Sequence, residues 1–489
     1  MTQAHKGTFR ERSIQALNDD QLRHNFKGAM EFLQNKRRSV FSDEVQAKLL
    51  RTQAHQIKAR ALSQLPELLE RLESNLIKNG IQVHWAETTE QACQAIYDIV
   101  KANQGEKLVK GKSMVSEEIG LNHYLEARGI ECVETDMGEY IVQLAKETPS
   151  HIIMPAIHKS KEEIAQLFVE HIPNVPYTEN VDELIGIGRR VLRDKFEQAD
   201  IGLSGVNFAV AETGTLCLVE NEGNGRMCTT VPRIHIALTG IEKVIEKLSD
   251  LPPLLSLLTR SATGQTITTY FNMISRPRQV GEKDGPEQVH LVLLDNGRSR
   301  MFQDQELQQT LRCIRCGACM NHCPVYSRIG GHAYGTVYPG PIGQVVSPQI
   351  LGIQKAGEIT EGCTLNAACG EVCPVEIPLP DLIRRLREER NLSQKSLSND
   401  GNMQTHPLGA GSQRKWQESI LWWLWKQVYS NEWLYRFVAR SLTRLHFLTP
   451  NRIPPWTDSR KAPKFATITL HDLMKQRASS PGVAKRSPK

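Results

Sequence analysis

The chain has 489 residues, of which 40% are hydrophobic and 23% charged, as expected for a folded protein of two or three domains. Its formal charge of +6 comes from residues 459–489, where eight Lys and Arg residues accompany a single Asp, which argues against a basic nucleic-acid-binding face on the rest of the chain. No apolar run approaches the roughly 18 residues needed to cross a bilayer and no secretory signal is recognisable, so we expect a cytoplasmic protein.

Residues 1–60 are polar and helix-prone, and we expect a helical extension without a functional site. From 61 to 300 the sequence alternates helical and strand patterns, which predicts an α/β domain with a largely parallel sheet. Helices are predicted over 62–79, from a Ser116 cap to Leu125, from a capping box of Ser160 and Glu163 to Val169, and over 181–198. Strands are predicted at 81–85, 108–109, 152–157, within 201–219, at 235–238 and at 289–294.

Glu212 stands out in a segment of small residues and glycines, 199–215. Its carboxylate could act as a nucleophile or base, with the amides of Gly214 and Thr215 holding an anion. Because no His or Lys pairs with it in the sequence, a turn between two strands is the favoured interpretation. The chain contains no P-loop and no dinucleotide-binding fingerprint.

The strongest signal is a run of four cysteines followed by Pro324, namely Cys313, Cys316, Cys319 and Cys323. The spacing C-x2-C-x2-C-x3-C-P is that of bacterial ferredoxins, in which the first three thiolates hold one cluster and the fourth holds another. A structural zinc site would use two separated C-x2-C pairs, so zinc is the less favoured alternative. The isolated cysteines are predicted to be small buried hydrophobic residues (Cys93, Cys132, Cys217 and Cys228).

A second motif contains Cys363, Cys369 and Cys373, with Asn366 where another cysteine would be expected. By the crossover rule the first cluster, read as [4Fe–4S], takes Cys313, Cys316, Cys319 and Cys373. The second site receives only three thiolates, from Cys323, Cys363 and Cys369. Its C-x5-C-x3-C-P spacing resembles the [3Fe–4S] motif of the succinate dehydrogenase iron–sulfur subunit. A [3Fe–4S] cluster, a [4Fe–4S] cluster with another ligand, a thiol from elsewhere, or no second cluster all remain open.

The remaining segments are assigned by composition. Residues 301–395 are expected to form an all-helical ferredoxin domain that ends in a helix over 381–390. The Gly- and Pro-rich loop between the motifs contains His332, which is predicted to be a hydrogen-bonding loop residue. Residues 396–412 form a polar linker, 413–458 a Trp-rich piece of two amphipathic helices, and 459–489 a basic disordered tail. The Trp-rich helices could lie at a membrane interface, but docking on protein is favoured.

Several of these motifs together resemble the lactate utilization protein B family. They are Lys-Ser-Met-Val-Ser-Glu-Glu, Thr-Asp-Met-Gly-Glu, Ala-Glu-Thr-Gly-Thr, and the loops Gly-Gly-His-Ala-Tyr-Gly and Tyr-Pro-Gly-Pro-Ile-Gly, beside the cysteine runs. The resemblance implies a sugar-isomerase/CoA-transferase-like α/β domain followed by a helical ferredoxin domain. It also implies electron transfer during L-lactate oxidation to pyruvate, with companion subunits and a quinone or other carrier as acceptor.

Three alternatives to this function stay open from the sequence. The electron donor could instead be a glycolate or glycerol-3-phosphate dehydrogenase, or the first domain could be an acyl-transfer or isomerase-like enzyme acting through Glu212. The clusters could also merely sense iron or oxygen. A peripheral position at the inner face of the membrane, through residues 413–489, is compatible with the basic and aromatic composition of that segment.

Overall fold

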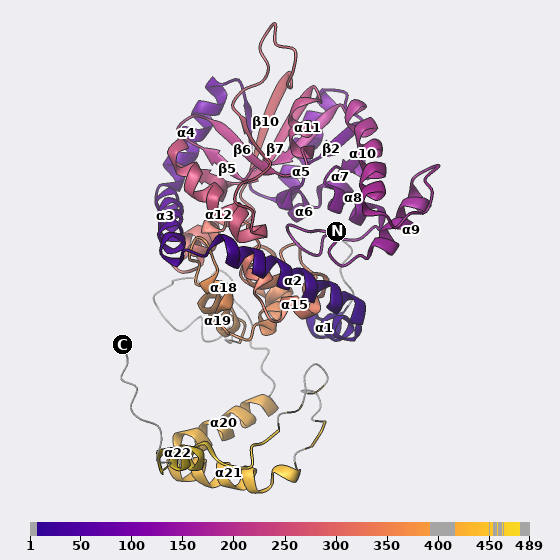
Figure 1. The fold of residues 1–489 in the computed structure, drawn as a ribbon. Helices are drawn as coiled ribbons and strands as arrows, with labels where there is room; N and C mark the ends of the chain where they lie inside the picture. The colour runs from indigo at the N-terminus through magenta and orange to yellow at the C-terminus, as the bar shows by residue number, and fades with distance from the viewer. Residues whose placement is uncertain are drawn as a thin grey trace. The chain divides into compact units, whose positions relative to one another are not determined.

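A computed structural model describes residues 7–391, 416–448, 450–452, 457, 462 and 464–479. The chain divides into two compact units, residues 1–410 and 411–489 (Figure 1). The predicted linker, 396–412, lies outside the described residues, and the finer division of the chain into domains stays a prediction.

The first unit begins with four helices, as the composition of the extension predicts: α1 (Phe9–Asn18), α2 (Asp20–Val40), α3 (Glu44–Ser63) and α4 (Leu65–Lys78). Thr8 and Glu11 form a capping box at α1, while Asp19 and Asp43 cap α2 and α3. The helix predicted over 62–79 begins instead at Leu65, because α3 continues to Ser63.

A six-stranded parallel sheet forms the centre of the α/β region, in the order β1-β10-β7-β4-β2-β3. Its strands are β1 (Gln82–Ala86), β2 (Lys107–Lys110), β3 (Glu131–Glu134), β4 (Ile201–Gly205), β7 (Ile234–Gly240) and β10 (Gln288–Leu294). Alternate residues of β10 belong to different cores: Leu291 packs with the α4 side chains, whereas Val292 packs with those of α5 (Thr89–Ala102). Both faces of the sheet are therefore buried, as is typical of parallel sheets.

A smaller sheet packs beside the first, in the order β8-β5-β6-β9. Its strands are β5 (Phe208–Val210), β6 (Thr215–Glu220), β8 (Val244–Ile245) and β9 (Tyr270–Ile274). The other helices of the α/β region are α6 (Met114–Glu118), α7 (Leu121–Glu126), α8 (Met137–Leu144), α9 (Lys161–His171), α10 (Val181–Glu197), α11 (Asn224–Thr230) and α12 (Leu251–Thr263). The Ser160–Glu163 capping box is confirmed at α9.

Two local predictions in this region are wrong. Residues 152–157 form an irregular loop rather than a strand, because His151 Nδ1 accepts the amide protons of Ile153 at 3.0 Å and Met154 at 3.2 Å, which curls the backbone. The helix expected from Ser116 to Leu125 is two short helices. Ser113 caps the first of them, and Gly120, with φ +66°, separates it from the second.

After Leu294 the described chain contains no strand, as predicted. The ferredoxin region consists of α13 (Arg298–Gln303), α14 (Ala318–Asn321), α15 (Tyr326–Ile329), α16 (Gly340–Leu351), α17 (Ile353–Ala356), α18 (Ala368–Glu371) and α19 (Leu379–Asn391), with 3-10 turns η3 (Leu307–Arg312), η4 (His332–Tyr334) and η5 (Gly357–Gly362).

The N-terminal helices pack directly on the cysteine region. In Figure 1 α2 runs beside α15 and α12, and it contacts both. Phe26 of α2 lies edge-on to Tyr326, with ring centroids 5.7 Å apart. The ring of Phe9 of α1 packs closely on Gly362, since a Cβ atom added to this glycine would lie 2.6 Å from the ring. Both phenylalanines belong to the core that includes the cysteines, so the extension is part of the ferredoxin region's core.

The second unit contains α20 (Trp416–Ser430), α21 (Glu432–Arg444) and α22 (Leu470–Ser479), which confirms the two Trp-rich helices. The disorder predicted for 459–489 is wrong for α22, where the hydroxyl of Thr469 accepts the amide of Asp472 at the helix start. Apolar residues of this segment, such as Ile468, line a pocket against α21. Trp416, Trp423 and Trp433 remain exposed, and none of the described helices is long and apolar enough to cross a membrane.

Candidate iron–sulfur sites

The two cysteine motifs have the same local structure. Each follows a 3-10 turn, and each has two residues with positive φ: Arg315 (+59°) and Gly317 (+76°) in the first, Leu365 (+56°) and Ala367 (+66°) in the second. A short helix, α14 or α18, then carries the next cysteine. Three of these four residues are not glycine, although a backbone with positive φ favours glycine. The surrounding structure must therefore impose this backbone conformation.

Backbone amides donate to the cysteine sulfurs in matching positions. Arg315 N–H donates to Cys313 Sγ at 3.4 Å, and Leu365 N–H donates to Cys363 Sγ at 3.3 Å. The last cysteine of each motif accepts a similar bond. Tyr326 N–H donates to Cys323 Sγ, and Ile377 N–H donates to Cys373 Sγ, each at 3.4 Å. Such bonds favour the ionised thiolate, which is the form that binds metal.

The fold brings Cys313, Cys316 and Cys319 together with Cys373. Burial raises the pKa of Cys316, and the neighbouring charges of Cys373 and Cys313 raise it further. Burial likewise raises the pKa of Cys373 to about 11, and Cys313 adds to the shift. Four thiolates cannot share such a buried space unless a cation offsets their repulsion. This donor set therefore fits an iron–sulfur core, which thiolates hold.

A second group contains Cys323, Cys363 and Cys369. Burial raises the pKa of Cys369 to about 12, and the charges of Cys363 and Cys323 contribute in the same direction. Asn366, at the position of the missing cysteine, is exposed, and Leu365 beside it is 42% exposed. The second group is therefore open to solvent on this side, whereas Cys316, at the corresponding position of the first motif, is buried.

Buried and half-buried cations lie beside the first group, and no sequence motif marks them. Lys243 Nζ lies 3.5 Å from the Cys313 carbonyl oxygen, and Lys58 Nζ donates at 2.7 Å to the carbonyl of Glu242. Burial lowers the pKa of both lysines to about 8, and Coulomb interactions with Glu242 and, to a smaller extent, with Cys313 oppose that shift. Arg51 Nε donates to the Cys373 carbonyl at 3.0 Å. Isolated Lys and Arg residues in helices and turns give no sequence signal for this placement.

A buried ion network joins the α/β and ferredoxin regions behind Cys313. Arg298 binds Glu118 through two nitrogens, each at 2.9 Å, and Glu242 through Nε at 2.6 Å. Tyr338 donates its hydroxyl to Glu118 at 2.6 Å, and its ring stacks under the Arg315 guanidinium, 4.3 Å from the centroid. Burial alone would raise the pKa of Glu118, but Arg298 lowers it overall, so this carboxylate stays charged.

A cavity of about 240 Å³ lies at the carboxyl ends of β2 and β4 and reaches the first cysteine group. Its lining includes Lys112, Asp136 and Glu222 from the α/β region, and Arg315 and Cys316 from the first motif. This edge of a parallel sheet is where ligands bind in open α/β folds. The cavity thus connects the edge of the sheet at which α/β folds commonly bind ligands with the first cysteine group.

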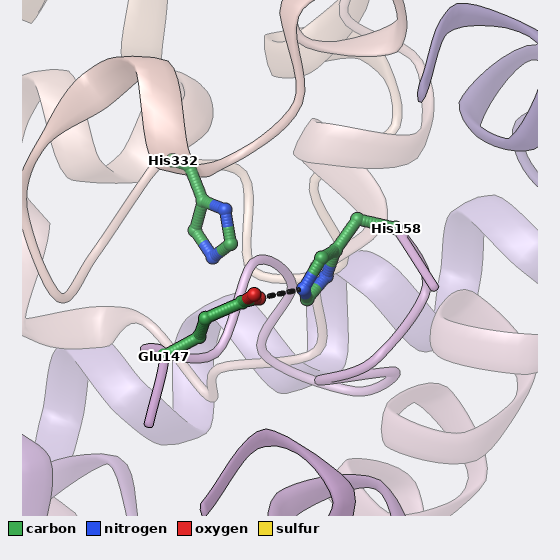
Figure 2. A group of neighbouring side chains, drawn as sticks. All are labelled: Glu147, His158 and His332. Carbon is green, nitrogen blue, oxygen red and sulfur yellow. Dashed lines mark hydrogen bonds and ion pairs between the residues drawn. The ribbon is translucent and has the colours of Figure 1, made fainter. Parts of the chain in front are cut away.

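Glu147, His158 and His332 gather where the α/β loop 147–160 meets the loop between the cysteine motifs (Figure 2). His158 Nε2 lies 2.7 Å from Glu147 Oε2, and Lys159 Nζ lies 2.5 Å from Oε1. Burial would raise the pKa of Glu147, but hydrogen bonds from His158 and Lys159 lower it to about 2. His332 Nε2 lies 2.6 Å from the Thr148 carbonyl, which confirms its prediction as a hydrogen-bonding loop residue.

Glu212 lies in the turn between β5 and β6, as favoured from the sequence. Its side chain is exposed, and Oε2 accepts the amide proton of Leu248 at 2.9 Å. Asn75 donates to the carbonyl of Glu212 at 3.1 Å, which ties the turn to α4. These contacts describe a structural turn. Cys93, Cys132, Cys217 and Cys228 are buried and unpaired, as predicted.

Three family models match successive parts of the chain: LUD domain over residues 69–294, 4Fe-4S dicluster domain over 309–377, and Lactate utilisation protein B, C-terminal, over 385–479. Lactate utilization protein B of Bacillus subtilis (strain 168) is 42% identical over 419 residues, which cover 85% of this chain and 87% of that one.

Two further relatives show the same extent of similarity. Lactate utilization protein B of Anoxybacillus flavithermus is 39% identical over 479 residues, covering 97% of this chain and 98% of the relative. A protein of Escherichia coli (strain K12), named uncharacterized electron transport protein YkgF, is 42% identical over 390 residues, covering 80% and 81%. With this identity over most of both chains, the protein belongs to the lactate utilization protein B family.

Proposed function

We propose that this protein is an iron–sulfur electron-transfer subunit that takes part in the oxidation of L-lactate to pyruvate. The family and the dicluster domain support a role in lactate utilisation that depends on iron–sulfur clusters. The observation that carries the proposal is the arrangement of seven cysteines in two groups, each containing the last cysteine of the other motif. Glycolate and glycerol 3-phosphate stay alternatives as electron sources, because no feature of the site selects among small hydroxy compounds.

The cysteines are the working residues of this mechanism. Cys313, Cys316, Cys319 and Cys373 would hold a [4Fe–4S] cluster, and Cys323, Cys363 and Cys369 a [3Fe–4S] or [4Fe–4S] cluster. Bound clusters of this kind accept and donate single electrons at potentials set by charge, hydrogen bonds and exposure. The chain supplies all three, through the amide–sulfur bonds, the buried cations and the solvent-exposed turn at Asn366.

Electrons would come from a partner dehydrogenase subunit and leave toward a quinone or carrier of the respiratory chain. The exposed turn at Leu365 and Asn366 is the surface of the second site that a partner can approach. We further infer a sugar-isomerase/CoA-transferase-like α/β domain over 61–300 and a ferredoxin domain over 301–395. Peripheral membrane contact through 413–489 is supported by the exposed tryptophans of α20 and α21.

Iron and sulfide analysis with EPR spectroscopy on anaerobically purified protein tests this proposal. Two [4Fe–4S] clusters would give about eight iron atoms per chain and signals only after reduction. A [3Fe–4S] second cluster would give about seven, with a near-isotropic signal in the oxidised protein. Protein without iron after anaerobic purification and reconstitution would contradict the proposal.

Replacing Asn366 by Cys is expected to complete the second site if the native cluster is [3Fe–4S]. The residue lies between two positive-φ residues, as Cys316 does in the first motif, so the new thiol would occupy the equivalent corner. Iron content should rise by about one atom per chain, and the oxidised-state EPR signal should disappear. Asn366→Ser, which adds no thiol, is the matched control. An oxidised-state signal that persists in Asn366→Cys would contradict this prediction, whereas its absence from the native protein would mean that the native second site already has four ligands.

A further inference from the structure

We infer that Lys58 and Lys243 are counter-ions of the first cluster, which raise its reduction potential by stabilising the extra negative charge of the reduced state. The inference rests on the proposed function, because it presupposes that Cys313, Cys316, Cys319 and Cys373 hold a cluster. It assigns a role to the α/β region and the N-terminal helices that the cysteine motifs alone do not suggest.

The two lysines are buried as deeply as core residues. Lys58 is 1% exposed and Lys243 is 6% exposed, in a part of the fold where an unpaired ammonium group is strongly disfavoured. The hydrogen-bond partners of both ammonium groups are main-chain carbonyls, that of Glu242 for Lys58 and that of Cys313 for Lys243. Carbonyl oxygens do not neutralise a positive charge, so these bonds leave a need for a nearby anion.

The carboxylates of this region meet that need only in part: Glu242 is the larger Coulomb partner of both lysines, and Cys313 is the next favourable one. Four cations, Lys58, Lys243, Arg298 and Arg315, share the space with Glu118 and Glu242. Both carboxylates bind Arg298, at 2.9 Å and 2.6 Å, whereas Arg315 lies 3.7 Å from Glu242. Arg315 Nη1 is also buried without a hydrogen-bond partner among the described residues. Among these six groups, positive charges therefore outnumber negative charges by two.

The surplus charge faces the first cysteine group. Lys243 lies against the Cys313 carbonyl, Arg315 lines the same cavity as Cys316 and interacts electrostatically with Cys313, and Lys58 interacts electrostatically with Cys313 as well. A cube held by four thiolates is an anion that gains one further negative charge on reduction. Positive charges held at this place therefore stabilise the reduced form more than the oxidised form, because Coulomb attraction grows with the charge on the cluster.

The surroundings of the second group differ. Cys323 lies beside the uncharged phenols of Tyr326 and Tyr334, and Arg387 approaches the group through the carbonyls of Thr360 and Cys363. Cys313 is the only cysteine with which either lysine interacts among the described residues, so we expect the lysine pair to act mainly on the first cluster. Because Lys58 comes from α3 and Lys243 follows β7, the extension and the α/β region jointly set the electrostatic environment of a cluster whose ligands lie in the ferredoxin region.

EPR-monitored redox titration of the full chain tests this inference. The first cluster's signal is identified as the one lost in Cys316→Ala. In Lys243→Met and in Lys58→Met the equilibrium between its reduced and oxidised forms is expected to shift about tenfold toward oxidised, which is a 59 mV fall in midpoint potential. The second cluster should keep its potential. Lys243→Arg, which retains the charge, should titrate like the wild type, as should Lys247→Met, whose side chain is 52% exposed.

The possible outcomes separate the inference from the proposed function. An unshifted first cluster in both Met variants, with full iron content, would overturn the inference and leave the proposed function intact. An equal shift in Lys243→Arg would also overturn it, because packing rather than charge would then be responsible. Loss of the first cluster from both Met variants, but not from Lys243→Arg, would support the requirement for charge. Wild-type protein without iron would instead contradict the proposed function.

Discussion

Cys323→Ala is expected to remove the second cluster and to preserve the first, although Cys323 belongs to the first motif. The reason is the grouping of the side chains: Cys323 interacts with Cys363 and Cys369, whereas Cys373 interacts with Cys313 and Cys316. Iron content should fall by about three or four atoms per chain, and the EPR signal of the first cluster should persist. In Cys373→Ala the opposite cluster should be lost.

A matched control is available within the chain. Cys93 is buried in α5, in a core separate from the one that contains both motifs, so Cys93→Ala creates a similar small cavity without removing a ligand. It should retain the full iron content. Loss of the first cluster's signal in Cys323→Ala, with the second retained, would show that each motif holds its own cluster and that the crossover assignment is incorrect.

Arg298→Met is expected to destabilise the first unit by about 3–5 kcal/mol, because it leaves Glu118 and Glu242 buried without their shared cation. For a unit of this size the midpoint of thermal unfolding should fall by about 5 °C. The measurement is anaerobic thermal unfolding followed by circular dichroism. Arg300→Met, two residues further along on the exposed side of α13, should change the midpoint little.

A double variant makes the electrostatic origin of this effect testable. Adding Glu118→Gln to Arg298→Met removes one of the two stranded charges, so part of the lost stability should return. A double variant as unstable as the sum of the two single variants would instead attribute the loss to packing. Tyr338 would then be replaced and its variant unfolded in the same way, because its hydroxyl also binds Glu118.

The sequence predicts the cysteine pattern and the alternation of helices and strands because both are local signals. Regular spacing identified Cys313 to Cys323, and apolar runs identified strands such as β10. Residues 152–157 have the same apolar composition but form a loop, because the His151 ring binds two amides that a strand would need. The composition of the segment does not reveal that a side chain competes with a neighbouring strand for these backbone amides.

The buried charges were not predictable for a different reason. Lys58 lies in α3, in a segment whose composition is polar and helix-prone, and Arg298 begins the short helix α13, so neither has a local signal of burial. A lysine on a polar face is usually solvated, and only the packing of residues distant in sequence removes it from water. The partners of Arg298, for example, come from positions 180 and 56 residues earlier in the chain.

The placement of α1 and α2 also bears on how the protein tolerates air. Phe9 fills the space beside Gly362, directly before Cys363, and Phe26 packs on Tyr326, whose amide binds Cys323. These rings cover part of the second site while the turn at Asn366 stays exposed, so we expect dioxygen to reach the site mainly at that turn. Resistance to oxidative damage is therefore expected to depend in part on a segment about 300 residues away in sequence from the thiolates that it covers.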